Sequence, residues 1–164
     1  MVTHTGYLGK TRLTVMSTGM GIGGIDIALN ELDALANIDF TTRQIKSQLR
    51  KLNIIRIGTS GAFQKDVPVD SIVVAKRAVG FDGLAGFYDA QFNDDELTFR
   101  QNILTAFNND PAIQPCYVVN GSEELVALFA NEAIVGTTAT SSGFYALKAV
   151  FCVHRLNCLI LLRQ

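Results

Sequence analysis

A run of glycines between a strand-like and a helix-like segment constrains the fold of this chain most. Residues 12–18 are short, apolar and β-branched, which predicts a strand, and residues 7–10 predict a hairpin turn that leads into it. The glycines that follow are Gly19, Gly21, Gly23 and Gly24. Apolar residues then recur at helical spacing, at Ile25, Ala28, Leu29, Leu32, Leu35 and Ala36. The order of strand, glycine loop and helix is typical of α/β proteins.

Two further apolar runs predict strands in the middle of the chain. Residues 53–58, NIIRIG, form a compact apolar run around Arg56 and predict a buried parallel strand. Residues 72–79, IVVAKRAV, predict another strand after the turn at Pro68. Between these runs, residues 59–66 are rich in small side chains and predict a loop.

The following part of the chain alternates between helix and strand patterns. Asp94, Asp95 and Glu96 would face the positive end of a helix that runs to about Phe107, so we interpret them as helix-start residues rather than acid/base catalysts. Strands are predicted at residues 116–120 and 133–140, with a short helix between them that Ser122 can cap and that runs to Ala130. The whole pattern predicts an α/β fold with a mainly parallel core sheet.

Composition and charge exclude several classes of protein. The chain has 164 residues, 48% of them apolar, and a mean hydropathy of +0.24, which disfavours disorder. A net charge of −1 provides no broad cationic field, so a dedicated nucleic-acid binder is disfavoured. The first residues lack the apolar run of a secretory signal, so we expect a cytoplasmic protein. Cys116, Cys152 and Cys158 lack metal-ligand spacing, and we interpret them as buried free thiols.

The composition changes after Tyr145. Residues 146–164 contain no acidic residue and no glycine, but hold two of the three cysteines. Lys148, His154, Arg155 and Asn157 interrupt this stretch, which is too short and too polar for a membrane span. Two interpretations stay open for it: a tail foreign to the preceding pattern, or an amphipathic terminal helix. We expect a domain over residues 1–145 and an atypical apolar tail over residues 146–164.

The glycine run matches the dinucleotide-binding fingerprint, with Gly19, Gly21 and Gly24 in the required places. That fingerprint also needs an acidic residue about 20 positions on, at the tip of the second strand. Asp39 has roughly this separation, but it falls where the helix runs out. A cofactor-binding Rossmann unit is therefore disfavoured. The backbone N–H groups near the start of the helix would still attract an anion.

Arg56 is the main candidate for binding chemistry. A guanidinium in an apolar strand costs desolvation unless an anion meets it, so a purely structural Arg56 would need a buried carboxylate partner. The alternative is a bound oxyanion, because Thr59 and Ser60 supply hydroxyls beyond the carboxyl end of a strand, where α/β sheets bind ligands. Gly58 and Gly61 let the backbone come close. Together these residues suit phosphate and a sugar.

These residues resemble the nucleoside phosphorylase family, with the uridine phosphorylase branch as the most similar part of it. The resemblance runs over roughly residues 2–145, and its most specific part is the RIGTSG stretch around Arg56. The other stretches that carry it are residues 17–21, residues 68–73 and residues 143–145. It implies a three-layer α/β/α fold with a central mixed, mainly parallel sheet.

The resemblance also implies an activity and a set of site residues. The family cleaves a nucleoside with inorganic phosphate to ribose 1-phosphate and free base, without metal or organic cofactor, so uridine and phosphate are the expected ligands. Arg56 would bind phosphate and act in catalysis, Thr59 would contact phosphate and ribose, and Gly19 would lie at the phosphate. Ser60, Gly61 and Phe144 would line the base. His4 is not required, and we interpret it as a surface residue.

The chain also departs from the family pattern. The family has two further phosphate arginines before the position where residue 1 stands, and a glutamine and an arginine after the position of Tyr145, where this chain has Ala146 to Ala149. We therefore expect a chain truncated at both ends, with little or no phosphorolysis. A full-length form is expected to be a homo-oligomer. The alternative is a non-catalytic module that binds phosphate or nucleoside, or that serves in oligomerisation.

Overall fold

The computed structural model describes residues 1–143, and they fall into two compact units. The first unit comprises Met1–Ile54, and the second begins at Ile55. The expected domain end at residue 145 and the tail of residues 146–164 lie outside the described residues.

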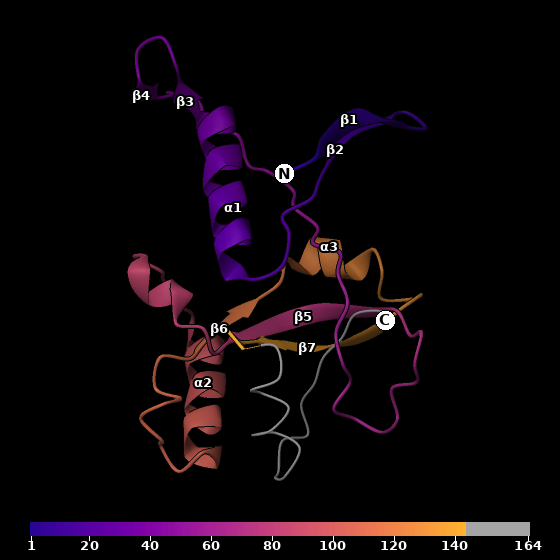
Figure 1. Ribbon diagram of the computed structural model, residues 1–164, viewed down its shortest axis with the longest axis vertical. Helices are drawn as coiled ribbons and strands as arrows, with labels where there is room; N and C mark the ends of the chain where they lie inside the picture. The colour runs from indigo at the N-terminus through magenta and orange to yellow at the C-terminus, as the bar shows by residue number, and fades with distance from the viewer. Residues whose placement is uncertain (144–164) are drawn as a thin grey trace. The chain divides into compact units, whose positions relative to one another are not determined.

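The first unit confirms the predicted hairpin, glycine loop and helix. Strands β1 (Thr3–Leu8) and β2 (Thr11–Met16) pair antiparallel, and Gly9 takes a φ of +60° in the turn between them. Helix α1 (Ile22–Asn37) begins within the glycine run, so that Gly23 and Gly24 lie in its first turn, and it comes after the hairpin in the chain, as Figure 1 shows. A small hairpin of β3 (Ile38–Asp39) and β4 (Gln44–Ile45) comes directly after it.

Two of the glycines are required by the backbone at the start of α1. Gly21 is the N-cap residue and has a φ of +90°, a conformation that side chains disfavour. A Cβ atom on Gly24 would lie 2.2 Å from the carbonyl oxygen of Thr18. The loop can therefore turn back on the helix only because glycine stands there. Ala28 is the buried apolar residue of the helix.

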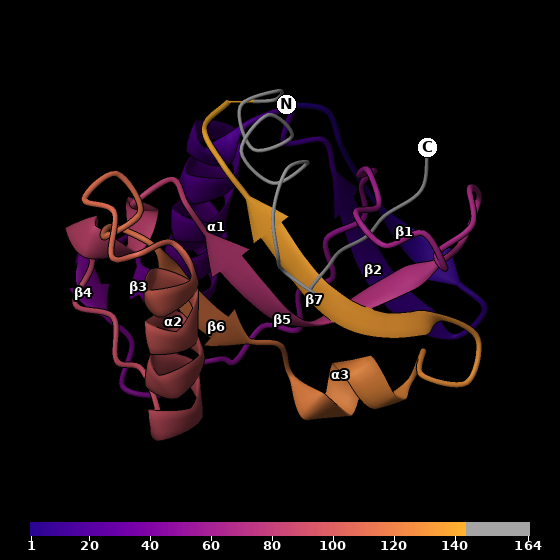
Figure 2. The ribbon, with the colours of Figure 1, turned by 90° about the horizontal axis from the view of Figure 1, so that it is seen from below.

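The second unit is built on a mixed sheet of order β6-β5-β7 (Figure 2). The central strand β5 (Val73–Gly80) pairs antiparallel with β6 (Tyr117–Asn120) and parallel with β7 (Ile134–Thr140). The ladder with β7 shifts register between Ala75 and Arg77, which leaves Lys76 as an extra residue in β5. The predicted strands at residues 72–79, 116–120 and 133–140 are confirmed.

Three helices connect the strands of this unit. They are the 3₁₀ helix η1 (Leu84–Phe87), α2 (Asp94–Ala106) and α3 (Glu123–Ala127). Asn93 and Glu96 form a reciprocal capping box at the start of α2, which confirms the helix-start interpretation of the acidic residues there. Ser122 caps α3 as predicted, although this helix ends at Ala127 and not at Ala130.

The core of the second unit lies between α2 and the sheet. Its buried residues are Val79, Ile103, Leu104, Cys116 and Val118. Val118, in β6, is only 1% exposed. The rings of Phe81 and Phe107 meet edge to face beside this cluster, with their centroids 6.3 Å apart. The α/β class with a mixed sheet is thus confirmed.

The predicted buried strand at residues 53–58 is wrong. In the part of the chain that the structure describes, this segment has no regular secondary structure and pairs with no strand. Ile57 is 89% exposed, and Ile54 and Ile55 are also exposed. Composition gives a segment the propensity for a strand, but a strand forms only where a neighbour accepts its backbone hydrogen bonds.

No helix within residues 1–143 has both the length and the apolar character that a membrane span requires.

Candidate functional site

Residues 56–61 form an exposed segment that carries the predicted phosphate ligand. The guanidinium of Arg56 lies over Gly58, so that a Cβ on Gly58 would be 3.5 Å from Nη1 of Arg56. Thr59 is exposed beside it, whereas Ser60 and Gly61 are half-buried. The hydroxyl of Ser60 donates a hydrogen bond of 3.3 Å to the carbonyl oxygen of Gly61. Cation and hydroxyls therefore lie within one short stretch.

The electrostatic setting of Arg56 differs from the buried one that the sequence predicted. The side chain is exposed, not buried in a strand, so desolvation does not require an anionic partner. Among residues 1–143 the structure also gives it no carboxylate within ion-pair distance, which argues against a purely structural Arg56. An exposed guanidinium with its fork of N–H donors is available to an incoming oxyanion.

The predicted site residues of the described part of the chain are found in both units. Gly19, with a φ of +73°, belongs to the first unit and precedes α1. Arg56, Thr59, Ser60 and Gly61 belong to the second unit. The residues that one site would need are thus divided between the units. Phe144 lies outside the described residues.

A polar pair at the carboxyl end of β5 was missed by the sequence analysis. The hydroxyl of Tyr117 donates a hydrogen bond of 3.0 Å to Oδ1 of Asp82, and the backbone N–H of Leu84 donates one of 2.9 Å to the same oxygen. Oδ2 of Asp82 is buried without a hydrogen-bond partner in the described part of the chain. The only signal in the sequence was an aspartate and a glycine directly after a strand, which is also an ordinary turn pattern.

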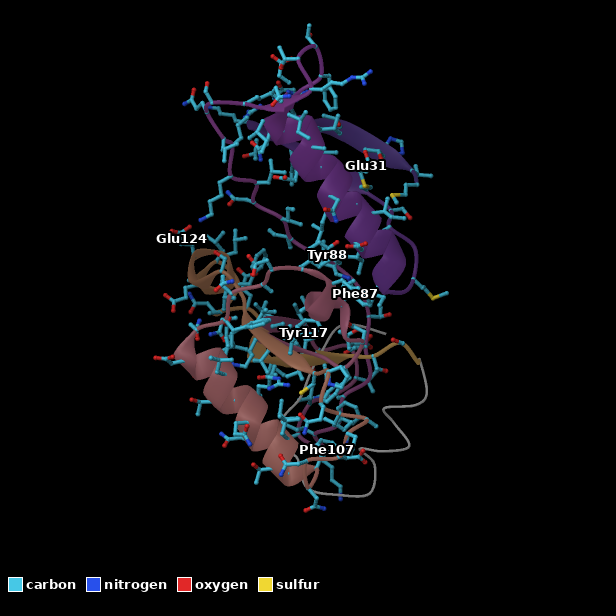
Figure 3. The ribbon with its side chains drawn as sticks, turned by 90° about the vertical axis from the view of Figure 1, so that its left-hand side faces the viewer. Glu31, Phe87, Tyr88, Phe107, Tyr117 and Glu124 are labelled. Carbon is cyan, nitrogen blue, oxygen red and sulfur yellow. The ribbon has the colours of Figure 1, made fainter. Side chains whose placement is uncertain are left out.

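The surroundings of this pair explain its electrostatics. The ring of Tyr117, which Figure 3 labels, packs against Gly80, where a Cβ would come within 2.1 Å of Cζ. Burial, and then the neighbouring carboxylate of Asp82, raise the pKa of Tyr117 to about 12. The hydroxyl therefore stays a hydrogen-bond donor at neutral pH, and it fixes the carboxylate next to the point where β5 ends.

A second polar cluster joins α2 to the sheet. Arg77 on β5 pairs with Asp95 at 2.5 Å, donates to Oδ1 of Asn120, and lies 4.3 Å from the ring centroid of Phe99. The hydrogen bond from Asn120, and then Arg77, lower the pKa of Asp95. Glu96 is buried, and its carboxylate accepts the backbone N–H of Asn120 at 2.7 Å. Because these groups satisfy one another, the cluster is structural.

The cysteine, histidine and acidic side chains of residues 1–143 are the other candidates for reactive chemistry. Within residues 1–143, no three His, Cys, Asp or Glu side chains gather as metal ligands would. Cys116 is a buried free thiol, as predicted, and burial raises its pKa. Cys152 and Cys158 lie outside the described residues. His4 is exposed on β1, which confirms its interpretation as a surface residue.

Comparison with known proteins supports the resemblance seen in the sequence. The family model of the phosphorylase superfamily matches residues 1–151. The DeoD-type purine nucleoside phosphorylase of Caldanaerobacter subterraneus subsp. tengcongensis is 28% identical over 181 residues, which cover 97% of this chain and 67% of that protein. A DeoD-type purine nucleoside phosphorylase of Bacillus cereus is 30% identical over 179 residues, with 97% and 66% covered.

A solved structure is also similar. It is the Trypanosoma brucei nucleoside phosphorylase that shows uridine phosphorylase activity, with a TM-score of 0.74 and 24% sequence identity. The superposition covers 87% of this chain and 53% of that chain. This likeness shows the fold. The chain spans about two thirds of the length of the curated relatives and about half of the solved structure. From the family match and these relatives, the chain belongs to the phosphorylase superfamily, among the nucleoside phosphorylases.

Proposed function

We propose that this protein binds inorganic phosphate and a pyrimidine nucleoside through residues 56–61, and that it is built for phosphorolysis of uridine. The observation that carries the proposal is the Arg56 guanidinium, which is exposed, lies over Gly58 and has no carboxylate partner within residues 1–143. The hydroxyls of Thr59 and Ser60 follow within four residues. Two oxygens of a phosphate can accept two parallel N–H groups of one guanidinium.

In phosphorolysis these residues would hold the phosphate and the nucleoside in place for reaction. A phosphate oxygen forms a bond to C1′ of the ribose while the bond from C1′ to the base nitrogen breaks, and the electron pair of that bond leaves with the base. Positive charge builds on the sugar in between. Arg56 holds and orients the phosphate, and Thr59 contacts phosphate and ribose. Ser60, Gly61 and Phe144 line the base, whose departing charge needs hydrogen-bond donors.

The choice of a pyrimidine base rests on the RIGTSG stretch and its likeness to the uridine phosphorylase branch. The curated relatives are named as purine nucleoside phosphorylases, whereas the trypanosome protein shows uridine phosphorylase activity. Uridine and inosine are therefore the two nucleosides to compare. With the purified chain and phosphate, we expect uridine to bind at least about tenfold more tightly than inosine, which corresponds to about 1.4 kcal/mol. Tighter binding of inosine would contradict the pyrimidine assignment.

Arg56→Ala tests the phosphate ligand directly. We expect the affinity for phosphate, measured by calorimetry, to fall about tenfold or more, because a hydrogen bond to a charged group is worth about 1.5–3 kcal/mol. Arg56→Lys should lose less, since it keeps the charge and gives up the fork.

The matched control is Lys65→Ala, which removes another exposed cation of the same unit. We expect its phosphate affinity to equal that of the wild type. Equal losses in both variants would mean that phosphate responds only to net charge, and the assignment of Arg56 would fail.

The second candidate is a non-catalytic module for phosphate or nucleoside binding, or for oligomerisation. The apolar side chain of Ile57, exposed within the same segment, favours association. Release of uracil from uridine and phosphate separates the two functions. Of the expected phosphate arginines the chain holds Arg56, so we expect slow release. Binding with no uracil at all would assign the module.

A further inference from the structure

The end of β6 carries the dipeptide Asn120–Gly121, which the proposed function does not use. It is the single place in the sequence where glycine follows asparagine. Such a pair is chemically labile in a free chain, because glycine has no Cβ to keep its backbone nitrogen away from the asparagine side chain. Both residues are exposed, so burial does not keep water from the pair.

The reaction that makes this pair labile joins the backbone nitrogen of Gly121 to Cγ of Asn120. The N–H loses its proton, the new bond closes a cyclic succinimide, and the bond from Cγ to Nδ2 breaks as ammonia leaves. Water then opens the ring at either carbonyl carbon, which yields aspartate or isoaspartate. The reaction therefore requires a Gly121 N–H that can lose its proton and an Asn120 amide that can rotate toward it.

The backbone of Gly121 is held against β5. Its N–H donates a hydrogen bond of 2.8 Å to the carbonyl oxygen of Lys76, the extra residue in that strand. A Cβ on Gly121 would lie 3.0 Å from the carbonyl oxygen of Ala75, closer than most Cβ atoms come to a neighbour. The close approach explains why glycine follows Asn120, and the same hydrogen bond occupies the N–H whose proton the reaction removes.

The side-chain amide of Asn120 is held at both of its polar atoms. Nε of Arg77 donates a hydrogen bond of 3.0 Å to Oδ1, and Nδ2 donates one of 3.1 Å to Oδ2 of Asp95. The backbone N–H of Asn120 donates to the buried carboxylate of Glu96 at 2.7 Å. Asn120 thus joins β6 to β5 and to the start of α2, which packs beside β6 (Figure 2). While these bonds last, the amide does not turn toward Gly121.

We propose that Asn120–Gly121 is a deamidation site that the native contacts keep unreactive, so that its modification follows opening of the contact between α2 and β6. The co-reactant is water, and the reaction needs no enzyme. All of the contacts involved lie within the second unit. The inference does not depend on the proposed phosphorolysis.

Deamidation would also weaken the contact that had prevented it. The hydrogen bond from Asn120, and then Arg77, lower the pKa of Asp95, which is therefore a carboxylate at neutral pH. A second carboxylate at position 120 would face Asp95 where the amide had donated a hydrogen bond. Each modified molecule would therefore open more readily at this place than an unmodified one.

Incubation of the full chain at neutral pH, followed by peptide mapping with mass spectrometry, measures the rate at position 120. We expect the folded wild type to form aspartate and isoaspartate at least about tenfold more slowly than the same chain in guanidinium chloride. That ratio corresponds to a free energy of opening of about 1.4 kcal/mol or more. Equal rates in the folded and unfolded chain would overturn the proposal.

Asp95→Ala removes the acceptor of the Asn120 amide. We expect the folded variant to deamidate at position 120 about threefold or more faster than the wild type. The matched control is Asp94→Ala, which removes the neighbouring carboxylate from the same first turn of α2. Within residues 1–143 that carboxylate makes no hydrogen bond to Asn120, so the rate should equal that of the wild type. Equal acceleration in both variants, or none in either, would contradict the proposed role of the contacts.

Asn120→Asp reproduces one product of the reaction. We expect its urea midpoint to lie below that of the wild type, because two carboxylates then face each other. The double variant N120D/D95N exchanges the amide and the carboxylate, and it should recover at least about half of that loss. A midpoint of Asn120→Asp equal to or above the wild type would refute the predicted weakening. Should Asp95→Ala fail to fold by circular dichroism, the comparison of folded with unfolded wild type decides.

Discussion

The raised pKa of Tyr117 makes the stability of the protein depend on pH. Folding raises its pKa from about 10 in the unfolded chain to about 12, through burial and the carboxylate of Asp82. A group whose pKa is raised on folding contributes stability that is fully present below the unfolded pKa. That contribution is lost as the pH rises from about 10 through about 12.

We therefore expect wild-type protein to lose about 1 kcal/mol of unfolding free energy between pH 9 and pH 11 through this group, a value discounted because the ring is only partly buried. Tyr117→Phe has no such proton, so its stability should fall less over the same range. Urea unfolding at the two pH values measures the difference. Parallel losses in both proteins would show that the interaction with Asp82 does not depend on the charge of the tyrosine.

Single residues could be predicted from the sequence where their role is local. Asp94 to Glu96 and Ser122 act on backbone groups within one turn, and the structure confirms both helix starts. Arg56 could not be placed in the same way, because its burial depends on whether another strand covers it. Asp82 and Tyr117 meet across 35 residues, a separation at which no local pattern operates.

Among the elements, α1 depends most clearly on its glycines. Gly24→Ala would put a Cβ 2.2 Å from the Thr18 carbonyl oxygen, a backbone atom that can move only if the loop moves. We expect a loss of about 2 kcal/mol in the free energy of unfolding. Urea unfolding followed by circular dichroism measures it.

The neighbouring glycine provides the control. A Cβ on Gly23 would meet nothing within 4 Å, so Gly23→Ala should leave the stability unchanged or raise it by up to about 1 kcal/mol through helix propensity. A similar loss in both variants would mean that the close approach to Thr18 is not what requires glycine at position 24.

Element types were predictable where side-chain periodicity and turn residues agree. The β1–β2 hairpin, α1, α2 and the strands of the mixed sheet all follow their patterns. Residues 53–58 did not form the predicted strand. An apolar run favours a strand, but the strand forms only where a neighbouring strand pairs with it. The direction of β6 could not be predicted either. Its antiparallel pairing with β5 arises from the path of the chain and not from the composition of the strand.

At the scale of the whole molecule, the two compact units meet in sequence at Ile54 and Ile55, inside a stretch without regular secondary structure. Exposed backbone of this kind is accessible to proteases. We expect brief trypsin treatment to cut after Lys51 and Arg56 before it cuts after Arg77 in β5 or Arg100 in α2. Mass spectrometry of the fragments identifies the sites, and early cleavage at Arg77 would contradict this order.

The family could be inferred from the sequence before the site could be assembled. Short motifs such as RIGTSG can be read directly from the sequence. They indicated the family, and the family match over residues 1–151 confirms it. Gly19 lies in the first unit and Arg56 in the second. The distance between two such residues is set by the tertiary structure, and a local motif does not encode it.

The parallel pairing of β5 with β7 has a consequence for how the chain is made. Val73 lies opposite Ile134, so the ribosome must add 61 residues after the start of β5 before its parallel neighbour begins. At about 5–20 residues per second, this delay is about 3–12 s. During that time the edge of β5 that later pairs with β7 has no partner in the nascent chain, and an unpaired strand edge is prone to pair with other chains.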